Sequence, residues 1–514
     1  MVGYKGICLM TNKFYITTAI PYVNASPHMG HALEFVQTDV IARYQKLEGR
    51  DVFVTTGTDE NSLKSVQAAA KEKVPAQLFC DRNSESFKKL AKDIGLHYDA
   101  FIRSSDKDAH WKGVERLWKS CFDSGDIYKK TYKGLYCTGC EAFYKESELV
   151  NGLCPEHLTP PEVVQEENYF FRLSRYEQKL EELILTNKLK VTPETRKNEV
   201  LSYIRQGLED FSISRPAERS KGWGIPVPND DSQKVYVWFD ALSVYLTGIG
   251  FGRDEKLFEK LWPADIHVIG KGIIRFHAIY WPAILMSAGL EVPKEVLVHG
   301  YVTSGGRKMS KSLGNVADPL KILGMYGEDG VRYYLLRKIP TFEDGDFSEE
   351  DVVTTINNEL VGNIGNFVHR TLTFIYKNFG GEVRVDGALE GAETKVLMEV
   401  GTLVSEAETS LSKNRLGNGL ADILAIAAAG NKYFQESKPW ETVTSDRQRC
   451  ERVLFTGASI CRTLSVLLYP YLPVASDKLS SYLNIDIKSF DDAKPLFKGS
   501  IKTAEPQPLF QKRP

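Results

Sequence analysis

Short runs of β-branched and aromatic residues alternate with longer helical patterns in the first part of the chain. Residues 14–20 predict a buried strand, residues 30–47 a helix that ends before Gly49, and residues 51–56 a second strand. Residues 62–119 are mostly helical in pattern. This order of strand, helix and strand predicts a βαβ opening and a doubly wound α/β fold with a parallel sheet.

The same alternation resumes after roughly a hundred residues. Residues 234–240, 265–269 and 295–299 each predict a strand, and residues 273–288 predict a helix. A proline-rich exit near residue 228 marks a boundary before this second set of strands. We therefore expect one parallel-sheet domain that is interrupted by an insertion. The predicted domains are residues 1–118 and 229–350 for the two halves of the sheet domain, 119–228 for the insertion, and 351–514 for a C-terminal region.

Helical patterns dominate the chain from about residue 351 onward. Residues 405–429 predict a helix that Gly417 and Gly419 could break, and residues 449–468 predict an apolar helix. Lys438-Pro439-Trp440 separates the two segments. This region is expected to form an α-helical bundle. An extended tail is expected to follow it, over residues 504–514.

Composition places the chain among ordinary soluble globular proteins. It has 514 residues, of which 42% are hydrophobic and 26% charged, with a net charge of −2. A nucleic acid would therefore have to bind through a local basic surface. The chain contains no run of eighteen apolar residues, which argues against a transmembrane helix. We therefore expect no membrane partner. The eight cysteines are mostly scattered, which points to a reducing compartment, by default the cytoplasm.

A turn with two histidines lies between the first predicted strand and the first predicted helix. His28 and His31 flank Gly30 at the expected start of the helix. Spaced three apart, both imidazoles lie on one face of the first helical turn. The N–H groups and dipole at that helix end favour a phosphate, and Gly30 lets a flat ligand approach. Taken alone, the pattern fits equally well a helix start with two surface histidines.

Four candidate metal ligands lie within the expected insertion. Their spacing is C-x2-C, thirteen residues, then C-x2-H, and the residues are Cys137, Cys140, Cys154 and His157. Two tight knuckles of this kind close a tetrahedral site for Zn2+. Four soft or borderline ligands leave no open position, so we expect one structural zinc ion and no hydrolytic metal. The less favoured alternative is a loop with unrelated cysteines.

A cationic loop with adjacent glycines follows the last predicted strand. It runs from Thr303 to Asn315 and includes Lys308, Ser310 and Lys311. Its cationic and hydroxyl groups can close over a polyphosphate and stabilise charge on a leaving group. Such a loop alone is more often a solvated turn. Its presence in one chain with the histidine turn favours the phosphate role.

The two motifs, in this order, resemble the two signatures of class I aminoacyl-tRNA synthetases. They are His28-Met29-Gly30-His31 and Lys308-Met309-Ser310-Lys311-Ser312, about 280 positions apart (308 − 28). Over nearly its whole length the chain is similar to the methionyl-tRNA synthetase family. The separation leaves little room for the editing insertion of the leucine, isoleucine and valine families. The cysteine family is the nearest rival, but its zinc binds the substrate thiol.

The resemblance implies an architecture and a reaction. The architecture is a Rossmann-type catalytic domain with a zinc-knuckle insertion and a C-terminal anticodon-binding bundle. The reaction joins L-methionine to ATP, with Mg2+ bound to the phosphates, to give methionyl-adenylate and pyrophosphate. The methionyl group then passes to the 3′ end of tRNA(Met). The chain stops after the bundle, without the appended domain that dimerises some relatives, so we expect a monomer.

The resemblance also implies which residues act. Two histidines would contact the α- and β-phosphates and two lysines the departing β- and γ-phosphates. The expected ATP-binding residues are His28, Gly30, His31, Lys308, Ser310 and Lys311, of which the histidines and lysines are catalytic. The expected methionine-binding residues are Ile20, Tyr22, Asp59, Trp238, Ala241, Tyr245, Ile273 and His277, with Trp238 at the end of a strand. The expected anticodon-binding residues are Asn366, Arg370 and Trp440.

These residue types suit their expected ligands. Aromatic rings suit a thioether, and the Tyr22 hydroxyl and His277 can donate to its sulfur. Asp59 would receive the substrate ammonium. A stacking ring with amide and guanidinium donors suits single-stranded bases. Without the resemblance, Trp238 and Tyr245 would be interpreted as core aromatics, and Trp440 could equally be a residue of a helix junction.

The chain departs from the family pattern at two places. Asn61-Ser62 stands where many relatives have His-Gly, and Gly272 stands where they often have Asp. Nucleotide contacts at these positions are therefore not carried over. Two other classes of function remain: a synthetase-like paralogue that binds tRNA without activating an amino acid, and a cytidylyltransferase-type nucleotidyltransferase. Intact signature residues disfavour the first, and the zinc insertion with the long helical end disfavours the second.

Overall fold

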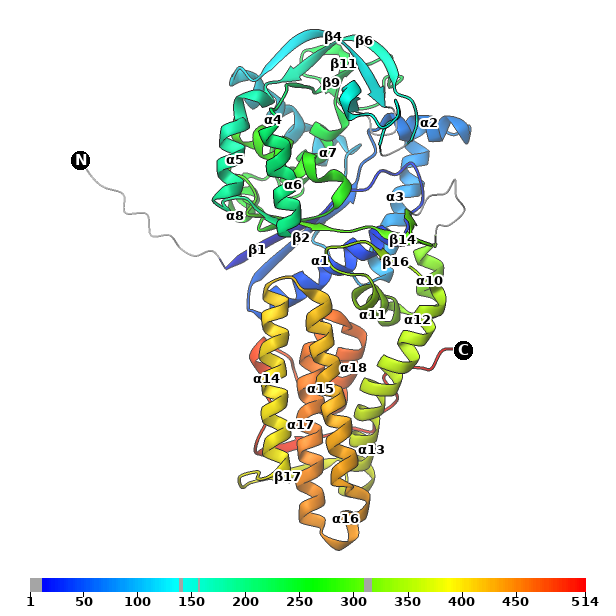
Figure 1. Cartoon of the computed structure of the whole chain (residues 1–514), viewed down its shortest axis with the longest axis vertical. Helices are drawn as coiled ribbons and strands as arrows, with labels where there is room; N and C mark the ends of the chain where they lie inside the picture. Colours follow the sequence, from blue (N-terminus) through cyan, green and yellow to red (C-terminus); the bar gives the residue numbers. More distant parts are fainter. Residues whose placement is uncertain (1–11, 138–141, 156–157, 309–316) are drawn as a thin grey trace, which may run out of the picture. The chain divides into compact units, whose positions relative to one another are not determined.

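The computed structural model describes residues 12–137, 142–155, 158–308 and 317–514 (Figure 1). The chain forms two compact units. The first comprises Met1–Pro27, Asp51–Leu90 and His97–His299, and the second comprises His28–Arg50, Ala91–Leu96 and Gly300–Pro514.

The first unit holds two larger sheets and one small sheet, with their covering helices. Its strands are β1 (Lys13–Thr18), β2 (Asp51–Thr58), β3 (Ala100–Arg103), β4 (Ile127–Cys137), β5 (Ala142–Tyr144), β6 (Glu162–Phe171), β7 (Lys190–Thr192), β8 (Phe211–Ser212), β9 (Ser214–Pro216), β10 (Pro226–Val227), β11 (Asp230–Val235), β12 (Ile266–Gly270) and β13 (Glu295–His299). Its helices are α2 (Leu63–Lys71), α3 (Ala76–Asp93, whose last residues belong to the second unit), η1 (Lys107–Trp111), α4 (Lys112–Asp123), η2 (Glu146–Glu148), η3 (Leu173–Tyr176), α5 (Glu177–Leu185), α6 (Glu194–Arg205), α7 (Val237–Thr247), α8 (Glu255–Leu261), η4 (Lys271–Ile273), η5 (Phe276–Tyr280) and α9 (Trp281–Ser287).

A six-stranded parallel sheet forms the centre of the first unit. The strand order is β3-β2-β1-β12-β13-β7, and every described neighbour pair is parallel. All six residues of β1 are buried, as expected for a parallel strand covered on both faces. The chain moves outward from β1 through β2 to β3, and in the other direction from β12 to β13. The switch point between β1 and β12 is where open parallel sheets bind ligands, outside the carboxyl ends of the strands.

The insertion contains a second, antiparallel sheet of order β5-β4-β6-β8. The long strands β4 and β6 pair from Ile127↔Phe171 to Tyr136↔Glu162. Strand β7, which forms the edge of the parallel sheet, also comes from residues between 119 and 228, although the sequence pattern did not predict it. The proposed domain boundaries remain a prediction.

The second unit is mostly helical, apart from short strands. Its helices are α1 (Met29–Leu47), α10 (Pro319–Tyr326), α11 (Glu328–Lys338), α12 (Glu349–Thr355), η7 (Ile356–Gly365), α13 (Asn366–Phe379), α14 (Ala392–Ser412), α15 (Leu416–Ser437), α16 (Pro439–Ser445), α17 (Arg447–Tyr471), α18 (Pro473–Leu483) and η8 (Phe490–Ala493). Its strands are β14 (Val302–Ser304), β15 (Arg307–Lys308), β16 (Gly345–Asp346), β17 (Glu382–Val385) and β18 (Gly499–Lys502).

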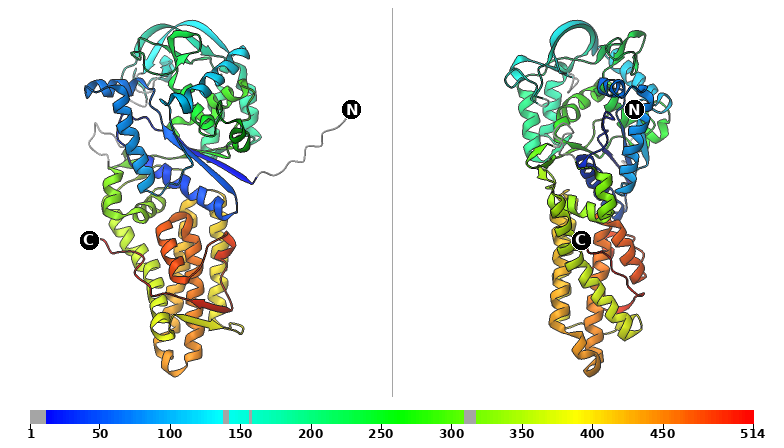
Figure 2. Two further views of the ribbon diagram at one scale, coloured as in Figure 1. Left: turned by 180° about the vertical axis from the view of Figure 1, so that it is seen from behind. Right: turned by 90° about the vertical axis from the view of Figure 1, so that its right-hand side faces the viewer.

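Long helices pack side by side to form the bundle. Helix α15 contacts both α14 and α17, and the three run together in the views of Figure 2. Among the described residues, α17 is the one helix long and apolar enough to cross a membrane, but 89% of its apolar window is buried inside the protein. It therefore has the burial of a core helix. The tail after residue 503 lacks helix and strand, and Arg513 exchanges hydrogen bonds with Asn357.

A buried ion pair joins α1 to the rest of the second unit. Arg332 on α11 is fully buried and lies 2.8 Å from Asp39 on α1. Its guanidinium also donates to three backbone carbonyl oxygens, those of Ile94, Pro470 and Tyr471. These acceptors satisfy a charge that would otherwise be costly to bury. The helix that begins with the histidine turn is thus fixed by interactions within its own unit.

Several sequence predictions are confirmed, and others need correction. The predicted strands at 14–20, 51–56, 265–269 and 295–299 are present as β1, β2, β12 and β13. The predicted strand at 234–240 is wrong, because β11 ends at Val235 and α7 begins at Val237. Trp238 therefore lies in the first turn of a helix. The β-branched and aromatic residues at 234–240 are typical of a strand, but the same apolar side chains can be buried by a helix. In the structure their burial on α7 outweighs their preference for a strand.

Two further differences concern element boundaries. Strand β3, between α3 and η1, was not separated from the helical pattern around it. The predicted helix at 405–429 is divided between α14 and α15, and the break precedes Gly417. Asn414 makes that break with a left-handed φ of 55°, a conformation that Asn tolerates better than most residues.

Candidate active site

The two signature histidines occupy the start of α1 in the second unit. His28 is the N-cap, and its Nδ1 accepts from the backbone N–H of Gly30 at 3.1 Å. The Nδ1 of His31 accepts from the backbone N–H of His28, also at 3.1 Å. A ring nitrogen that accepts carries no hydrogen, so these bonds assign the neutral rings as Nε2–H tautomers. The Nε2–H groups of His28 and His31 belong to half-buried rings at the N-terminal, positive end of a 19-residue helix.

The two imidazoles are stacked on one another. Their centroids are 3.7 Å apart and their planes differ by 15°. Gly30 favours this arrangement, because a Cβ at that position would lie 3.0 Å from both Cε1 and Nδ1 of His28 and would push the ring by a few tenths of an ångström. The turn therefore presents two N–H donors on stacked rings, and the placement of the His28 ring depends on the missing side chain of Gly30.

The start of the cationic loop is a short hairpin in the second unit. Strand β14 pairs with β15, with Thr303 opposite Lys308. The Asp346 carboxylate accepts from the backbone N–H groups of Gly305 and Gly306, each at 3.0 Å. These bonds keep the pKa of Asp346 below its usual value. The backbone of Lys308 is thus placed in a strand, whereas Ser310 and Lys311 lie outside the described residues.

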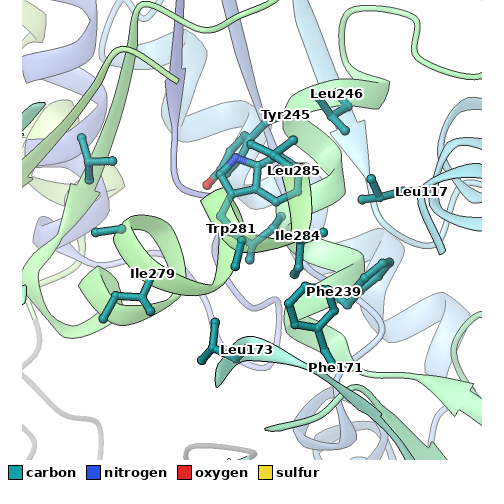
Figure 3. Packing of buried hydrophobic residues seen from close by; sticks show 14 of the residues in the cluster. Leu117, Phe171, Leu173, Phe239, Tyr245, Leu246, Ile279, Trp281, Ile284 and Leu285 are labelled. Atoms are coloured by element: carbon teal, nitrogen blue, oxygen red, sulfur yellow. The ribbon is translucent and has the colours of Figure 1, made fainter. Parts of the chain in front are cut away.

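Aromatic side chains from three elements meet in the first unit. The Trp238 indole stacks on Phe276, with centroids 3.8 Å apart, and meets the edge of Tyr22 at 6.3 Å. Tyr245, two turns further along α7, lies 5.7 Å from the His277 ring. Figure 3 shows Tyr245 against Trp281, within the apolar core of the unit. The predicted residues Tyr22, Trp238, Tyr245 and His277 therefore belong to one aromatic cluster, joined by the unpredicted Phe276.

Hydrogen bonds fix the protonation of His277. Its Nδ1 lies 3.0 Å from the Ile273 carbonyl oxygen and must donate, and its Nε2 lies 2.8 Å from the Tyr245 hydroxyl. Burial lowers the pKa of His277 to about 4, so the ring is neutral near pH 7 and carries one hydrogen. Nε2 therefore accepts from Tyr245. The expected donation from His277 to a thioether sulfur is not available in this arrangement.

A different donor faces the same cluster. The indole Nε1 of Trp238 is buried and has no hydrogen-bond partner within the part of the chain that the structure describes. An unsatisfied buried N–H is costly, and a bound ligand or a water molecule would satisfy it. This orphaned donor was not predicted from the sequence, because its exposure depends on how the rings pack.

Asp59 lies where the carboxyl ends of two parallel strands converge. Its backbone N–H donates to the Pro21 carbonyl at 2.8 Å, and its carbonyl accepts from Val23. These bonds extend the pairing of β1 and β2 and place Tyr22 opposite Asp59. Ile20 is half-buried in the same segment after β1, Ile273 follows β12, and Ala241 is buried on α7. The structure thus brings the predicted pocket residues to the carboxyl edge of the sheet.

The three expected anticodon residues lie together in the second unit. Asn366 and Arg370 are one turn apart on α13, and Trp440, on α16, is 39% exposed. The Arg370 guanidinium carbon lies 5.9 Å from the Trp440 ring centroid. Two side chains of α15 hold these residues: Asn431 accepts from the Asn366 amide at 3.0 Å, and Gln435 accepts from Arg370 at 3.2 Å. The neighbours on α15 were not predicted.

The structure describes half of the expected zinc ligand set. Cys137 ends β4 and Cys154 follows a tight β-bridge between Val150 and Leu153, and both are buried. Two buried cysteine sulfurs, one at a strand end and one after a tight bridge, fit a soft metal such as Zn2+. Cys140 and His157 lie outside the described residues, so the absence of a three-ligand cluster among the described ones does not test the set.

Sequence reasoning missed several residues that support the site. The Glu60 carboxylate is fully buried and receives two hydrogen bonds from Arg103. His110 and Asp240 form another buried contact, at 2.6 Å. The one sequence feature that pointed to Glu60 was the acidic segment directly after β2. The partners come from residues far away in the sequence, and no short motif marks them.

Comparisons with known proteins show the family to which the chain belongs. The family described as class I tRNA synthetases (M) matches residues 14–160 and 157–372, and the anticodon-binding domain of methionyl tRNA ligase matches residues 383–512. The curated methionine–tRNA ligase of Brucella suis is 40% identical over 507 residues, 97% of both chains. That of Rhizobium meliloti is 41% identical over 511 residues, which is 97% of this chain and 98% of the relative.

Solved structures show the same relationship. The Mycobacterium tuberculosis methionyl-tRNA synthetase bound by methionyl-adenylate matches with a TM-score of 0.92 at 39% identity, covering 97% of this chain and 100% of that one. The free form of that enzyme matches with a TM-score of 0.85 at 36% identity, covering 98% of each chain. The parallel-sheet fold with a helical C-terminal region is confirmed. The chain belongs to the methionyl-tRNA synthetase family of class I aminoacyl-tRNA synthetases.

Proposed function

We propose that this protein activates L-methionine with ATP and transfers the methionyl group to the 3′ end of tRNA(Met). The observation that carries the proposal is the pair of stacked Nε2–H imidazoles at the start of α1, in a chain of this family. In the first step, a methionine carboxylate oxygen attacks the α-phosphorus, an α-phosphate–oxygen bond breaks, and pyrophosphate leaves. In the second, the terminal ribose hydroxyl of the tRNA attacks the methionyl carbonyl and AMP leaves.

His28 and His31 act on the phosphates in the first step. Their Nε2–H groups donate to the α- and β-phosphate oxygens, where negative charge shifts as the leaving group separates. The backbone bonds to Nδ1 hold both rings in place before substrate binds, so little reorganisation is needed. Gly30 contributes by leaving room for the rings.

Lys308, Ser310 and Lys311 form the second half of the phosphate site. Cations and a hydroxyl at these positions stabilise the β- and γ-phosphates as pyrophosphate leaves. The Asp346 bonds to Gly305 and Gly306 anchor the base of this loop. Mg2+ bound with ATP would neutralise part of the phosphate charge.

The aromatic cluster of the first unit forms the methionine side-chain site. A thioether packs well against ring edges, which Tyr22, Trp238 and Tyr245 supply together with the apolar Ile20, Ala241 and Ile273. Neutral His277 holds the Tyr245 hydroxyl, and Tyr22 together with the Trp238 N–H supplies donors for the sulfur. Asp59 receives the substrate ammonium.

The bundle reads the tRNA anticodon through Asn366, Arg370 and Trp440. An exposed ring next to a guanidinium group suits a splayed-out base, which stacks on one and hydrogen-bonds to the other. Cys137, Cys140, Cys154 and His157 would hold one structural zinc ion, which would close the knuckle of the insertion. We further propose that the protein acts as a cytoplasmic monomer.

Amino-acid-dependent ATP–pyrophosphate exchange tests the first step. Purified protein is assayed with each of the twenty amino acids, and exchange with methionine alone is expected. Exchange with cysteine in place of methionine would overturn the pocket assignment. No exchange with any amino acid would favour a tRNA-binding paralogue.

Anticodon reading is tested by comparing two reactions in the same variants. Arg370→Gln and Trp440→Ala are expected to lower kcat/KM for tRNA charging by at least tenfold, because each removes a base contact. Exchange without tRNA should stay within twofold of the unaltered protein. Normal charging in both variants would refute the anticodon assignment while leaving methionine activation intact.

A further inference from the structure

A chain of buried hydrogen bonds leads from the segment after β2 to helix α7. The Asn61 amide nitrogen lies 2.8 Å from one carboxylate oxygen of Asp240, and the other oxygen lies 2.6 Å from Nε2 of His110. Nδ1 of His110 lies 2.7 Å from the Thr247 hydroxyl. His110, Asp240 and Thr247 are at most 1% exposed. None of these four side chains has been assigned a role in binding methionine, ATP or tRNA.

The chemistry of the groups gives each bond a direction. A carboxylate only accepts, so Nε2 of His110 must carry a hydrogen. In the neutral ring Nδ1 then accepts, and its donor is the Thr247 hydroxyl. Asp240 and Thr247 are seven residues apart, about two turns along one face of α7. The His110 ring, from the one-turn helix η1, therefore bridges two turns of α7.

The two turns that His110 bridges also carry the proposed methionine-site residues of α7. Trp238, Ala241 and Tyr245 all lie between Val237 and Thr247. An axial shift or rotation of α7 would move the Trp238 and Tyr245 rings, and it would also break the bonds to His110. The relay thus fixes the element on which one wall of the pocket is built.

Asn61, at the other end of the chain of bonds, is held by two hydrogen bonds. Its side-chain nitrogen Nδ2 donates to Asp240 and also to the Ser104 carbonyl oxygen, 2.8 Å away. That carbonyl accepts from the Trp111 indole as well, at 3.1 Å. Both hydrogens of the Asn61 amide are therefore engaged within the protein. The residue that departs from the common family pattern serves as a structural link at this point, two positions after Asp59.

We propose that Asn61, His110, Asp240 and Thr247 form a positioning relay that sets α7 against the carboxyl end of β2 and so determines the affinity for methionine. The inference rests on the proposed methionine site. The four side chains act through Trp238 and Tyr245 and touch neither substrate. Weakening the relay should loosen methionine binding, whereas ATP binding, which the proposal assigns to other residues, should be retained.

Thr247→Val gives the sharpest test, with Thr247→Ser as its matched control. Valine keeps the γ-methyl group that packs at Gly113 but removes the hydroxyl, so Nδ1 of His110 loses its donor. Serine keeps the hydroxyl. In ATP–pyrophosphate exchange, Thr247→Val is expected to raise KM for methionine about tenfold, the equivalent of about 1.4 kcal/mol. KM for ATP should change less than twofold, and Thr247→Ser should behave like the unaltered protein.

Asn61→Ala tests the opposite end of the relay, where the side chain is only half-buried and its loss is better tolerated. It should give the same selective rise in KM for methionine. An unchanged KM for methionine in both variants would overturn the relay, and so would an equal rise in KM for methionine and ATP, even where Tm falls. If Thr247→Val does not fold, the Asn61→Ala result alone decides.

A further variant separates this inference from the proposed function. His277→Ala removes a group of the methionine site itself. If it leaves KM for methionine unchanged, the pocket assignment fails. If it raises KM for methionine while Thr247→Val and Asn61→Ala do not, the pocket stands and the relay alone is refuted.

Discussion

Replacing Gly30 by alanine should separate activity from stability. The added Cβ would lie 3.0 Å from Cε1 and Nδ1 of His28, closer than the 3.4–4 Å of ordinary contact, so the ring must move by a few tenths of an ångström. That movement weakens the bond from the Gly30 N–H to Nδ1 and disturbs the stack with His31. The two phosphate donors would no longer be preorganised.

The expected changes can be estimated separately. Loss of the hydrogen bond costs about 1 kcal/mol. Alanine in place of glycine in a helix returns up to about 1 kcal/mol, so net stability should change little. Misplacing one donor to the transition state, by contrast, should lower the exchange rate about 10- to 100-fold.

Pyrophosphate exchange with methionine measures the rate, and urea unfolding measures the stability. Gly401→Ala is the matched control, because Gly401 lies within α14 and a Cβ there meets nothing within 4 Å. It should leave the exchange rate unchanged and stability equal or slightly higher. A normal exchange rate in Gly30→Ala would refute the reasoning about ring placement. A large loss of stability in that variant would show that the substitution acts on folding.

Three further changes have expected outcomes. Arg332→Met should lower the free energy of unfolding by about 3 kcal/mol in urea, because the buried Asp39 carboxylate would keep only Arg43 and three backbone carbonyl oxygens would lose their donor; a loss below about 1 kcal/mol would contradict this. Burial lowers the pKa of His277 from 6.5 to about 4. Between these two pH values the unfolded chain binds a proton at His277 and the folded protein does not. Its contribution to stability is therefore complete above pH 6.5 and is lost as the pH falls towards 4, by up to about 3 kcal/mol. The stability of His277→Gln should depend less steeply on pH over that range, and an identical pH profile would contradict the assignment. Metal analysis of the purified protein should find one zinc ion per chain, and Cys154→Ser should reduce zinc content and lower Tm; full zinc content in that variant would exclude Cys154 as a ligand.

Local patterns were sufficient where the chemistry is contiguous in the chain. The turn from His28 to His31 and the alternation around β1 and β2 depend on neighbouring residues, and their spacing carries the signal. The strand predicted at residues 234–240 failed because a run of apolar residues fits a buried strand and a buried helix alike. Only the packing of α7 in the core of its unit decided between them.

The sequence alone determined that His28 and His31 lie at the start of a helix, since they are three residues apart at the beginning of a helical pattern, and it determined the order of the two signatures. Tertiary structure decided which ring nitrogens carry hydrogen and how Trp238, Phe276 and His277 face one another. It also decided that Asn61, His110 and Asp240 meet, although 130 positions separate the last two. Such contacts depend on the fold of the whole unit, because hydrogen-bond partners that are distant in the chain leave no periodic pattern in it.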